Sequence, residues 1–175
     1  MNHLATSKED ILAASRELIK ENGWAAVSIR ALASRCSVSS GTIYNYYESK
    51  ADLLGETIES IWQEIFFHPE DEQIFHDAAA CISWIYERLE YGNRQFPGFF
   101  SLHSFSFMRE EKNDGKKRMM KTWGHIQNGL CNVLKNDPKI RPDVFDQQFT
   151  ENQFADILFS LILVAITRQD YDPSS

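Results

Sequence analysis

The stretch LASRCSVSSGTIYNYYESK, residues 32–50, predicts two short helices joined by a tight turn. In the second of these helices, Ile43 and Tyr47 are four residues apart and define one inward face. At about 100° per residue, Gly41 and Asn45 then point away from the core. A glycine there allows another backbone or a ligand to approach closely, which a merely solvated helix does not need. The pattern is that of a recognition helix in the major groove of DNA, and a surface turn with chance aromatic residues is the alternative.

Several polar residues in and around this stretch are candidates for contacting DNA. Asn45 points at base edges, and Tyr44 and Tyr46 flank it, where their hydroxyls reach phosphates. Lys50 lies in the first turn of the next predicted helix, where a cation is slightly unfavourable unless a phosphate is its partner. For Ser28 and Arg30 a plain helix cap and a solvated arginine are the alternatives, and for Lys50 a chance surface lysine. The candidates are Ser28, Arg30, Ser39, Ser40, Gly41, Thr42, Tyr44, Asn45, Tyr46 and Lys50.

The same residues resemble the TetR family of bacterial repressors, whose signature runs close to A-x-x-A-G-V-S-x-G-T-L-Y-x-H-F-x-x-K. Cys36 and Ser37 stand where the family usually has Ala-Gly, and Tyr46 and Tyr47 stand for His-Phe. A serine at a turn position that favours positive φ costs on the order of 1 kcal/mol. The resemblance covers about residues 5–66 and implies an all-α protein with a three-helix helix-turn-helix head and a helical body. The matching residues are Ala33, Val38, Ser39, Gly41, Thr42, Ile43, Tyr44, Tyr46, Tyr47 and Lys50.

The length and composition suit either one compact protein or a small DNA-reading head on a larger helical body. The chain has 175 residues, and its 43% hydrophobic content is enough for real cores. A net charge of -7 argues at first against a nucleic-acid partner. The charge is uneven, however, because residues 1–50 carry six Lys or Arg and five Asp or Glu, a net +1, which leaves -8 for the rest. An acidic body behind a near-neutral head orients the head toward DNA by repulsion.

Helical periodicity continues to the end of the chain, and no stretch alternates at period two for long enough to predict a sheet. Thr6 with Glu9 is expected to form a capping box at the start of the first helix. We expect residues 1–50 to be the helix-turn-helix domain and residues 51–175 to be a regulatory and dimerisation domain, in which residues 51–67 form the linking helix.

The last predicted helix is apolar nearly all round between residues 157 and 166, so it cannot be a surface helix that faces one core. We expect a homodimer through the last two helices, in which a second chain covers this segment. A charge at whichever of Leu158, Leu161 or Ala165 faces the partner is expected to yield monomers.

Aromatic residues crowd between residues 96 and 107, and others lie on the neighbouring helices. Together they are candidates to line a cavity for an apolar or aromatic effector, and plain hydrophobic core is the alternative for each of them. The effector candidates are Trp62, Phe66, Trp84, Phe100, His103, Phe107 and Trp123.

The remaining features argue against other classes of protein. Three cysteines without C-x-x-C spacing predict neither a disulfide framework nor a zinc site, and no two histidines have the i, i+4 spacing of a ligand pair. No nucleophile or phosphate-loop motif occurs, so we expect no enzymatic activity, no metal and no cofactor. Without a signal-peptide pattern or an apolar run long enough for a membrane span, we expect a cytoplasmic protein without a membrane partner.

The resemblance therefore implies a ligand-responsive transcriptional regulator, with repression as the expected mode. In this mechanism an effector moves the linking helix and changes the separation of the two heads, which must match major grooves about 34 Å apart on a palindromic operator. The alternative is a DNA-binding architectural or adaptor protein whose body binds a protein partner and has no ligand cavity.

Overall fold

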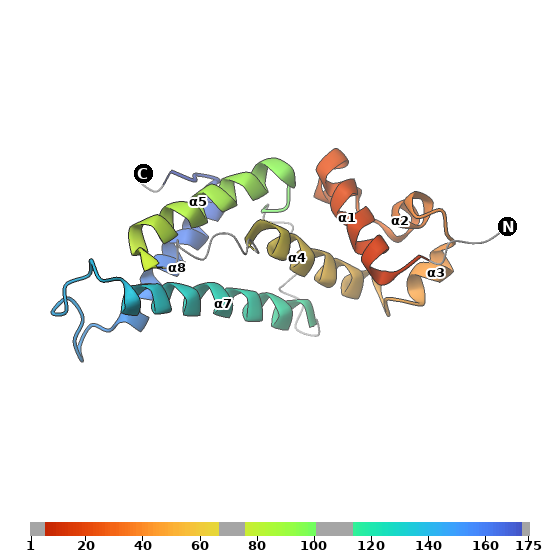
Figure 1. Ribbon diagram of the computed structural model, residues 1–175. Helices are drawn as coiled ribbons and strands as arrows, with labels where there is room; N and C mark the ends of the chain where they lie inside the picture. The colour runs from red at the N-terminus through yellow and green to blue at the C-terminus, as the bar shows by residue number, and fades with distance from the viewer. Residues whose placement is uncertain (1–5, 67–75, 101–113, 173–175) are drawn as a thin grey trace. The chain divides into compact units, whose positions relative to one another are not determined.

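A computed structural model of the chain describes residues 6–66, 76–100 and 114–172 (Figure 1). These residues form helices and connecting turns and contain no strand, which confirms the all-α prediction. The elements in chain order are α1 (Lys8–Asn22), the 3-10 helix η1 (Trp24–Ala26), α2 (Ile29–Arg35), α3 (Ser40–Tyr44), α4 (Lys50–Phe66), α5 (Ala78–Gln95), α7 (Asp114–Asn136) and α8 (Glu151–Arg168).

The start of α1 differs by one residue from the predicted capping box. Ser7 Oγ accepts a hydrogen bond from the Asp10 amide at 3.1 Å, and the Asp10 carboxylate accepts one from the Ser7 amide at 2.8 Å. The predicted pair of Thr6 and Glu9 was therefore wrong, although both pairs have the chemistry of a capping box.

Two later helices also begin with side-chain caps. Ser49 Oγ accepts a hydrogen bond from the Asp52 amide at 3.1 Å, directly before α4. Thr150 and Gln153 form a reciprocal capping box at the start of α8. Each of these caps satisfies backbone amides that have no partner within the helix.

Packing divides the chain into two compact units. The first contains Met1–Glu64 and Asn93–Met119, and the second contains Ile65–Gly92 and Met120–Ser175. The helix α4 belongs to the first unit as far as Glu64, and its last two residues belong to the second. This division concerns packing, and the functional boundary at residue 50 stays a prediction.

The first unit has a core built from the inward faces of α1 to α4. Each aliphatic side chain that is fully buried there stabilises the fold by about 1.5–3 kcal/mol. A buried hydrogen bond of 3.0 Å joins the hydroxyls of Ser15 on α1 and Thr57 on α4, so these two polar groups are satisfied inside the core. The large side chains in this core that are exposed by 1% or less are Ile11, Ile19, Leu32, Ile43, Tyr47, Leu53 and Ile61.

A turn of aromatic residues that follows α5 completes this core. The ring of Phe99 lies 5.9 Å from that of Trp24 and 5.8 Å from that of Trp62, in edge-on contacts. The Trp24 amide donates a hydrogen bond of 2.9 Å to the carbonyl of Pro97. Gly98, at φ 78°, adopts the left-handed conformation that the turn requires and lies against Trp24. Part of the aromatic crowding after residue 95 is thus core of the first unit.

The second unit packs α5, α7 and α8 together with the end of α4. The carboxylate of Asp137, which is only 7% exposed, links two of these helices because it accepts a hydrogen bond of 2.8 Å from the Ala78 amide at the start of α5. Its other oxygen accepts from the Lys139 amide, and the Lys139 ammonium pairs with Asp77. The residues buried in this unit include Cys81, Ile85, Leu89, Leu130, Val133, Ile162, Ala165 and Ile166.

One face of α8 is buried and another is exposed. Ala155, Ile162 and Ala165 face the unit's own core, whereas Ile157, Leu161 and Val164 are 48%, 52% and 43% exposed. Of the three positions at which we placed a contact with a second chain, Leu161 is exposed and Ala165 is buried within its own chain. None of the helices in the described part of the chain combines the length and the apolar content that crossing a membrane requires.

Candidate functional site

The turn between α2 and α3 has the backbone conformation that the sequence predicts. Ser37 has φ 56°, in the left-handed region, as expected for the position where the family signature has glycine. Backbone hydrogen bonds hold it there, because the Val38 amide donates to the Ala33 carbonyl at 2.9 Å and the Ser37 amide donates to the Ser34 carbonyl at 3.1 Å. These bonds offset the small cost of a serine in this conformation.

The helix α3 presents its inward and outward faces as predicted. Its N-cap Ser39 accepts a hydrogen bond of 3.1 Å from the Thr42 amide, and Ile43 is fully buried. Tyr44 is 52% exposed, and Asn45, the C-cap residue, is exposed beside it. The side chains directed away from the core thus form a polar and aromatic surface that the described part of the chain does not cover.

Gly41 lies on this exposed surface, and the chain's own packing does not require a glycine there. A Cβ atom at this position would meet only the Ser39 hydroxyl, at an ordinary 3.5 Å. Its backbone is in an ordinary helical conformation, so positive φ is not the reason either. The space that the missing side chain leaves is therefore open to a molecule outside the chain.

Two tyrosines after α3 attach it to the start of α1, a contact that sequence reasoning missed. The Tyr46 hydroxyl donates a hydrogen bond to the Thr6 carbonyl, and the Tyr47 hydroxyl donates one of 3.5 Å to the Lys8 carbonyl. The Lys8 ammonium lies over the Tyr47 ring, 5.2 Å from its centroid. Because the Tyr46 hydroxyl proton is used within the chain, a contact from this hydroxyl to a phosphate requires the bond to Thr6 to open.

Most basic side chains of the first 50 residues are neutralised by acids of the same unit. Arg35 makes two hydrogen bonds of 2.6 and 2.7 Å to the Glu21 carboxylate, and these lower the pKa of Glu21. The other pairs are Lys8 with Glu56 at 2.6 Å, Arg16 with Glu64 at 3.1 Å, and Lys20 with Glu64 at 2.8 Å.

Two basic residues differ from these four. Among the described residues, Arg30 and Lys50 form no ion pair, and both side chains are exposed. Arg30 is the second residue of α2 and Lys50 is the first residue of α4, so they lie on the helices that precede and follow α3. These two exposed cations lie on the helices that flank α3 in the chain, where they are available to an external anion.

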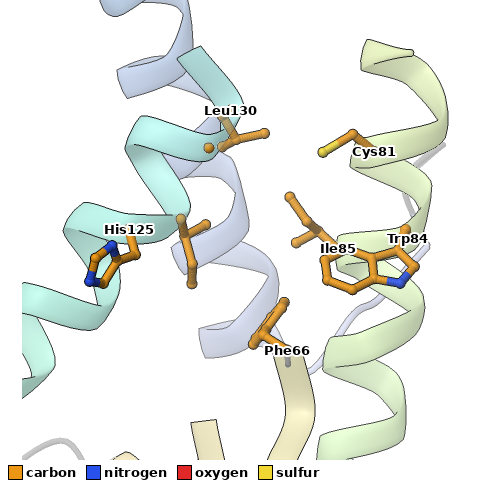
Figure 2. A pocket seen from close by; sticks show the side chains of 8 residues that line it. Phe66, Cys81, Trp84, Ile85, His125 and Leu130 are labelled. Carbon is orange, nitrogen blue, oxygen red and sulfur yellow. The ribbon is translucent and has the colours of Figure 1, made fainter. Parts of the chain in front are cut away.

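The second unit contains a cavity of about 180 Å³ between α5 and α7 (Figure 2). In Figure 2, Ile85 is directed from α5 and Leu130 from α7 into this space, and Phe66 at the end of α4 lies at one end of it. The Phe66 and Trp84 rings are in edge-on contact with centroids 5.8 Å apart. The described lining residues are Phe66, Cys81, Trp84, Ile85, His125, Ile126, Gly129 and Leu130.

A polar contact holds the end of α4 beside this cavity. The Arg88 guanidinium on α5 donates a hydrogen bond of 2.5 Å from Nε to the carbonyl of Ile65 in the last turn of α4. Cations are favourable at the carboxyl end of a helix, where carbonyl groups have no partner within the helix. Phe66 is therefore held in the cavity wall both by its ring contact and by the backbone next to it.

A family of known proteins matches the N-terminal part of the chain that contains α2 and α3. Residues 11–57 match the family of bacterial regulatory proteins described as the tetR family. Over these residues the chain is a match to the TetR family. This match includes α2, α3 and the start of α4, which are the elements that carry the exposed polar surface.

A curated TetR-type relative and two solved structures extend the comparison. The HTH-type transcriptional regulator UidR of Escherichia coli K12 is 41% identical over 44 residues, which are 25% of this chain and 22% of UidR, so the chain spans about a fifth of the length of that relative. A transcriptional regulator from Rhodococcus sp. Rha1 superposes with a TM-score of 0.68 at 18% identity, covering 97% of this chain and 86% of the other. FadR of Bacillus subtilis, solved in complex with stearoyl-CoA, superposes with a TM-score of 0.62 at 18% identity, covering 93% and 86%. At this identity the two structures establish the fold.

The predicted effector residues of this chain lie in several places. Phe66 and Trp84 line the cavity. Trp62 and Phe100 are buried in the first unit with ring centroids 5.6 Å apart, and Trp123 packs against Phe159 on α8 at 5.8 Å. His103 and Phe107 lie outside the described residues.

Sequence reasoning missed the other six lining residues. Cys81 and Ile85 on α5 are four residues apart, as are His125 and Gly129 on α7, and so are Ile126 and Leu130. Helical spacing therefore indicated which residues share a face. It did not indicate that the faces of α5 and α7 enclose a space between them.

Proposed function

We propose that this chain is a TetR-family, DNA-binding transcriptional regulator whose head reads an operator through α3. The observation that carries this proposal is that Arg30 and Lys50 are exposed, form no ion pair with any described residue, and lie on the helices that precede and follow the exposed residues around Asn45. A surface with free cations beside an uncovered amide suits the DNA major groove, where phosphates position the protein and base edges specify the sequence.

The candidate residues take separate roles in this proposal. Asn45 contacts base edges, since a side-chain amide pairs with the edge of adenine in two hydrogen bonds. Gly41, between Ser40 and Thr42, lets the backbone approach the groove closely. Phosphate contacts come from Ser28, Arg30, Ser39, Thr42, Tyr44, Tyr46 and Lys50.

We further propose a homodimer in which two copies of α8 cover each other's exposed apolar face. Ile157, Leu161 and Val164 recur at i, i+4 and i+7, so they lie along one side of the helix. A two-fold pairing of this face buries it and places two heads on successive half-sites about 34 Å apart in a palindromic operator. The residues 51–175 then form the regulatory and dimerisation domain behind the DNA-binding domain of residues 1–50.

The cavity supports a small-molecule effector as the regulatory partner. The alternative, a protein partner that binds the helical body, would not require a cavity. Phe66 is the last residue of α4, and Lys50 is its first. A ligand that displaces Phe66 acts on the same helix that begins with a proposed phosphate contact, and repression relieved by the effector follows from this link.

Selection of bound duplexes from a random pool tests the DNA proposal. We expect enriched sequences with two inverted half-sites whose centres are 10–10.5 base pairs apart or a multiple of that spacing. Enrichment of single half-sites would contradict the proposed homodimer. The absence of any enriched sequence would contradict the proposal that the head recognises an operator.

A further inference from the structure

We propose that the cavity between α5 and α7 binds a compact uncharged hydrocarbon ligand, either one aromatic ring or an alkyl chain of similar volume, with at most one neutral polar group. This inference rests on the proposed effector function of the cavity, and it names the chemical class of the effector. It is carried by three properties of the cavity: the chemistry of its walls, its volume and the position of its polar margin.

The described walls are almost entirely hydrocarbon. Phe66, Ile85, Ile126 and Leu130 contribute apolar groups, and Trp84 contributes an indole. No Asp, Glu, Lys or Arg is among the described lining residues. A carboxylate or ammonium ligand would lose its hydration on entry without gaining an opposite charge, and this cost excludes charged ligands from the interior.

Cys81 extends this apolar character. Burial raises the pKa of its thiol to about 11, so the thiol stays protonated at neutral pH. A protonated buried thiol behaves as a small apolar group and is a poor nucleophile and metal ligand. Cys81 therefore contributes contact area to the ligand, and no covalent bond.

The volume limits the size of the ligand. An apolar protein cavity of about 150 Å³ stays dry and accommodates benzene, and the cavity of about 180 Å³ in this chain is similar. Pockets for larger, drug-sized ligands begin at about 300 Å³. A long acyl chain or a ligand that carries a nucleotide therefore does not fit within this volume and would have to extend outside it.

The margin of the cavity provides one place for a polar group. His125 is exposed, and in Figure 2 its imidazole lies on α7 away from Ile85, at the edge of the space and not within it. An imidazole offers one hydrogen-bond donor and one acceptor when it is neutral. A single hydroxyl or carbonyl on the ligand, directed outward at this margin, is satisfied by His125 or by water while the hydrocarbon part remains buried.

Two glycines on α7 provide a matched test. A Cβ atom at Gly129 or at Gly124 meets no atom of the described residues within 4 Å apart from its own chain neighbours and helix backbone, so both positions have room for the first atom of a side chain. Only Gly129 lines the cavity. Replacing glycine by leucine raises helix propensity by the same amount at both positions. The variants Gly129→Leu and Gly124→Leu therefore differ in whether the added atoms occupy the cavity.

Isothermal calorimetry with benzyl alcohol, without DNA, is the measurement. We expect wild type and Gly124→Leu to bind with the negative heat-capacity change of apolar burial, and Gly129→Leu to bind at least about tenfold more weakly. Gly129→Ala adds fewer atoms to the cavity, so its affinity for benzyl alcohol should lie between those of wild type and Gly129→Leu. Thermal unfolding monitored by circular dichroism confirms that each variant is folded before titration.

Benzoate and 1-dodecanol complete the experiment as a charged ligand and a long-chain ligand. Benzyl alcohol binding at least about tenfold more tightly than either supports the proposed class. Equal or tighter binding of benzoate or dodecanol overturns it, as does unchanged binding to Gly129→Leu or no binding of benzyl alcohol at all. Because these titrations contain no DNA, their failure leaves the operator-selection result intact, and failure of operator selection leaves them intact.

Discussion

The segment of residues 37–50, which we propose to read DNA and call the recognition turn, differs from the cavity in how far apart along the chain its residues lie. Residues 37–50 form the turn, α3 and the link to α4, and their conformation is held largely by hydrogen bonds between residues three to five positions apart. The cavity combines Phe66 with residues of α5 and with residues of α7 that lie about 60 positions further on. A surface held by contacts between residues close together in the chain can therefore be predicted from the sequence. A pocket lined by helices that are distant in the chain depends on how those helices pack.

The largest expected effect is on the assembly that we propose for the second unit. Leu161→Glu places a charge in the centre of the proposed α8 contact, where an unpaired buried charge costs about 3–5 kcal/mol. We expect monomers by analytical ultracentrifugation at micromolar concentration. Ser83→Glu, on an exposed part of α5, should remain dimeric. A wild-type protein that is already monomeric would rule out the contact.

The next largest effect, on the free energy of unfolding, tests which side of α3 in the recognition turn packs against the core. Ile43 is fully buried, so Ile43→Ala should lower the free energy of unfolding by about 2–5 kcal/mol. Tyr44→Ala, on the exposed side of the same helix, should change it by less than about 0.5 kcal/mol. Chemical denaturation monitored by circular dichroism measures both. Similar losses for the two variants would mean that α3 faces differently from the arrangement described.

A smaller effect separates reading of bases from holding of phosphates. Asn45→Ala should weaken binding to the selected operator by about 1–3 kcal/mol and weaken binding to random duplexes much less. Fluorescence anisotropy titrations on both duplexes measure this difference. Equal losses of affinity for operator and random DNA would indicate that Asn45 contacts the DNA backbone and not the bases.

The smallest effect concerns salt dependence. Lys50→Ala should weaken binding to all duplexes and reduce the slope of log K against log salt by about one per head. Lys135→Ala removes an equal charge from an exposed position on α7, so it is the control, and its slope should match wild type. If the two lysine variants share one slope, the charge of Lys50 acts only through the net charge of the protein.

The sequence by itself determined the all-α class, the family and the geometry of the recognition turn. The signals were the spacing of Ile43 and Tyr47 and the serine that occupies the left-handed position at residue 37. Each of these depends on atoms within about one helical turn, so residue type and spacing were sufficient.

Tertiary structure alone decided which side chains meet across the fold. Trp62 and Phe66 lie on one helix four residues apart, yet Trp62 packs with Phe99 and Phe100 in the first unit while Phe66 lines the cavity in the second. The same holds for the cations, since Lys8 and Lys20 find acids on α4 whereas Arg30 and Lys50 find none among the described residues. An apolar or charged side chain pairs with whatever the packing of distant helices brings to it, and hydrophobic burial, being non-directional, does not name that partner in advance.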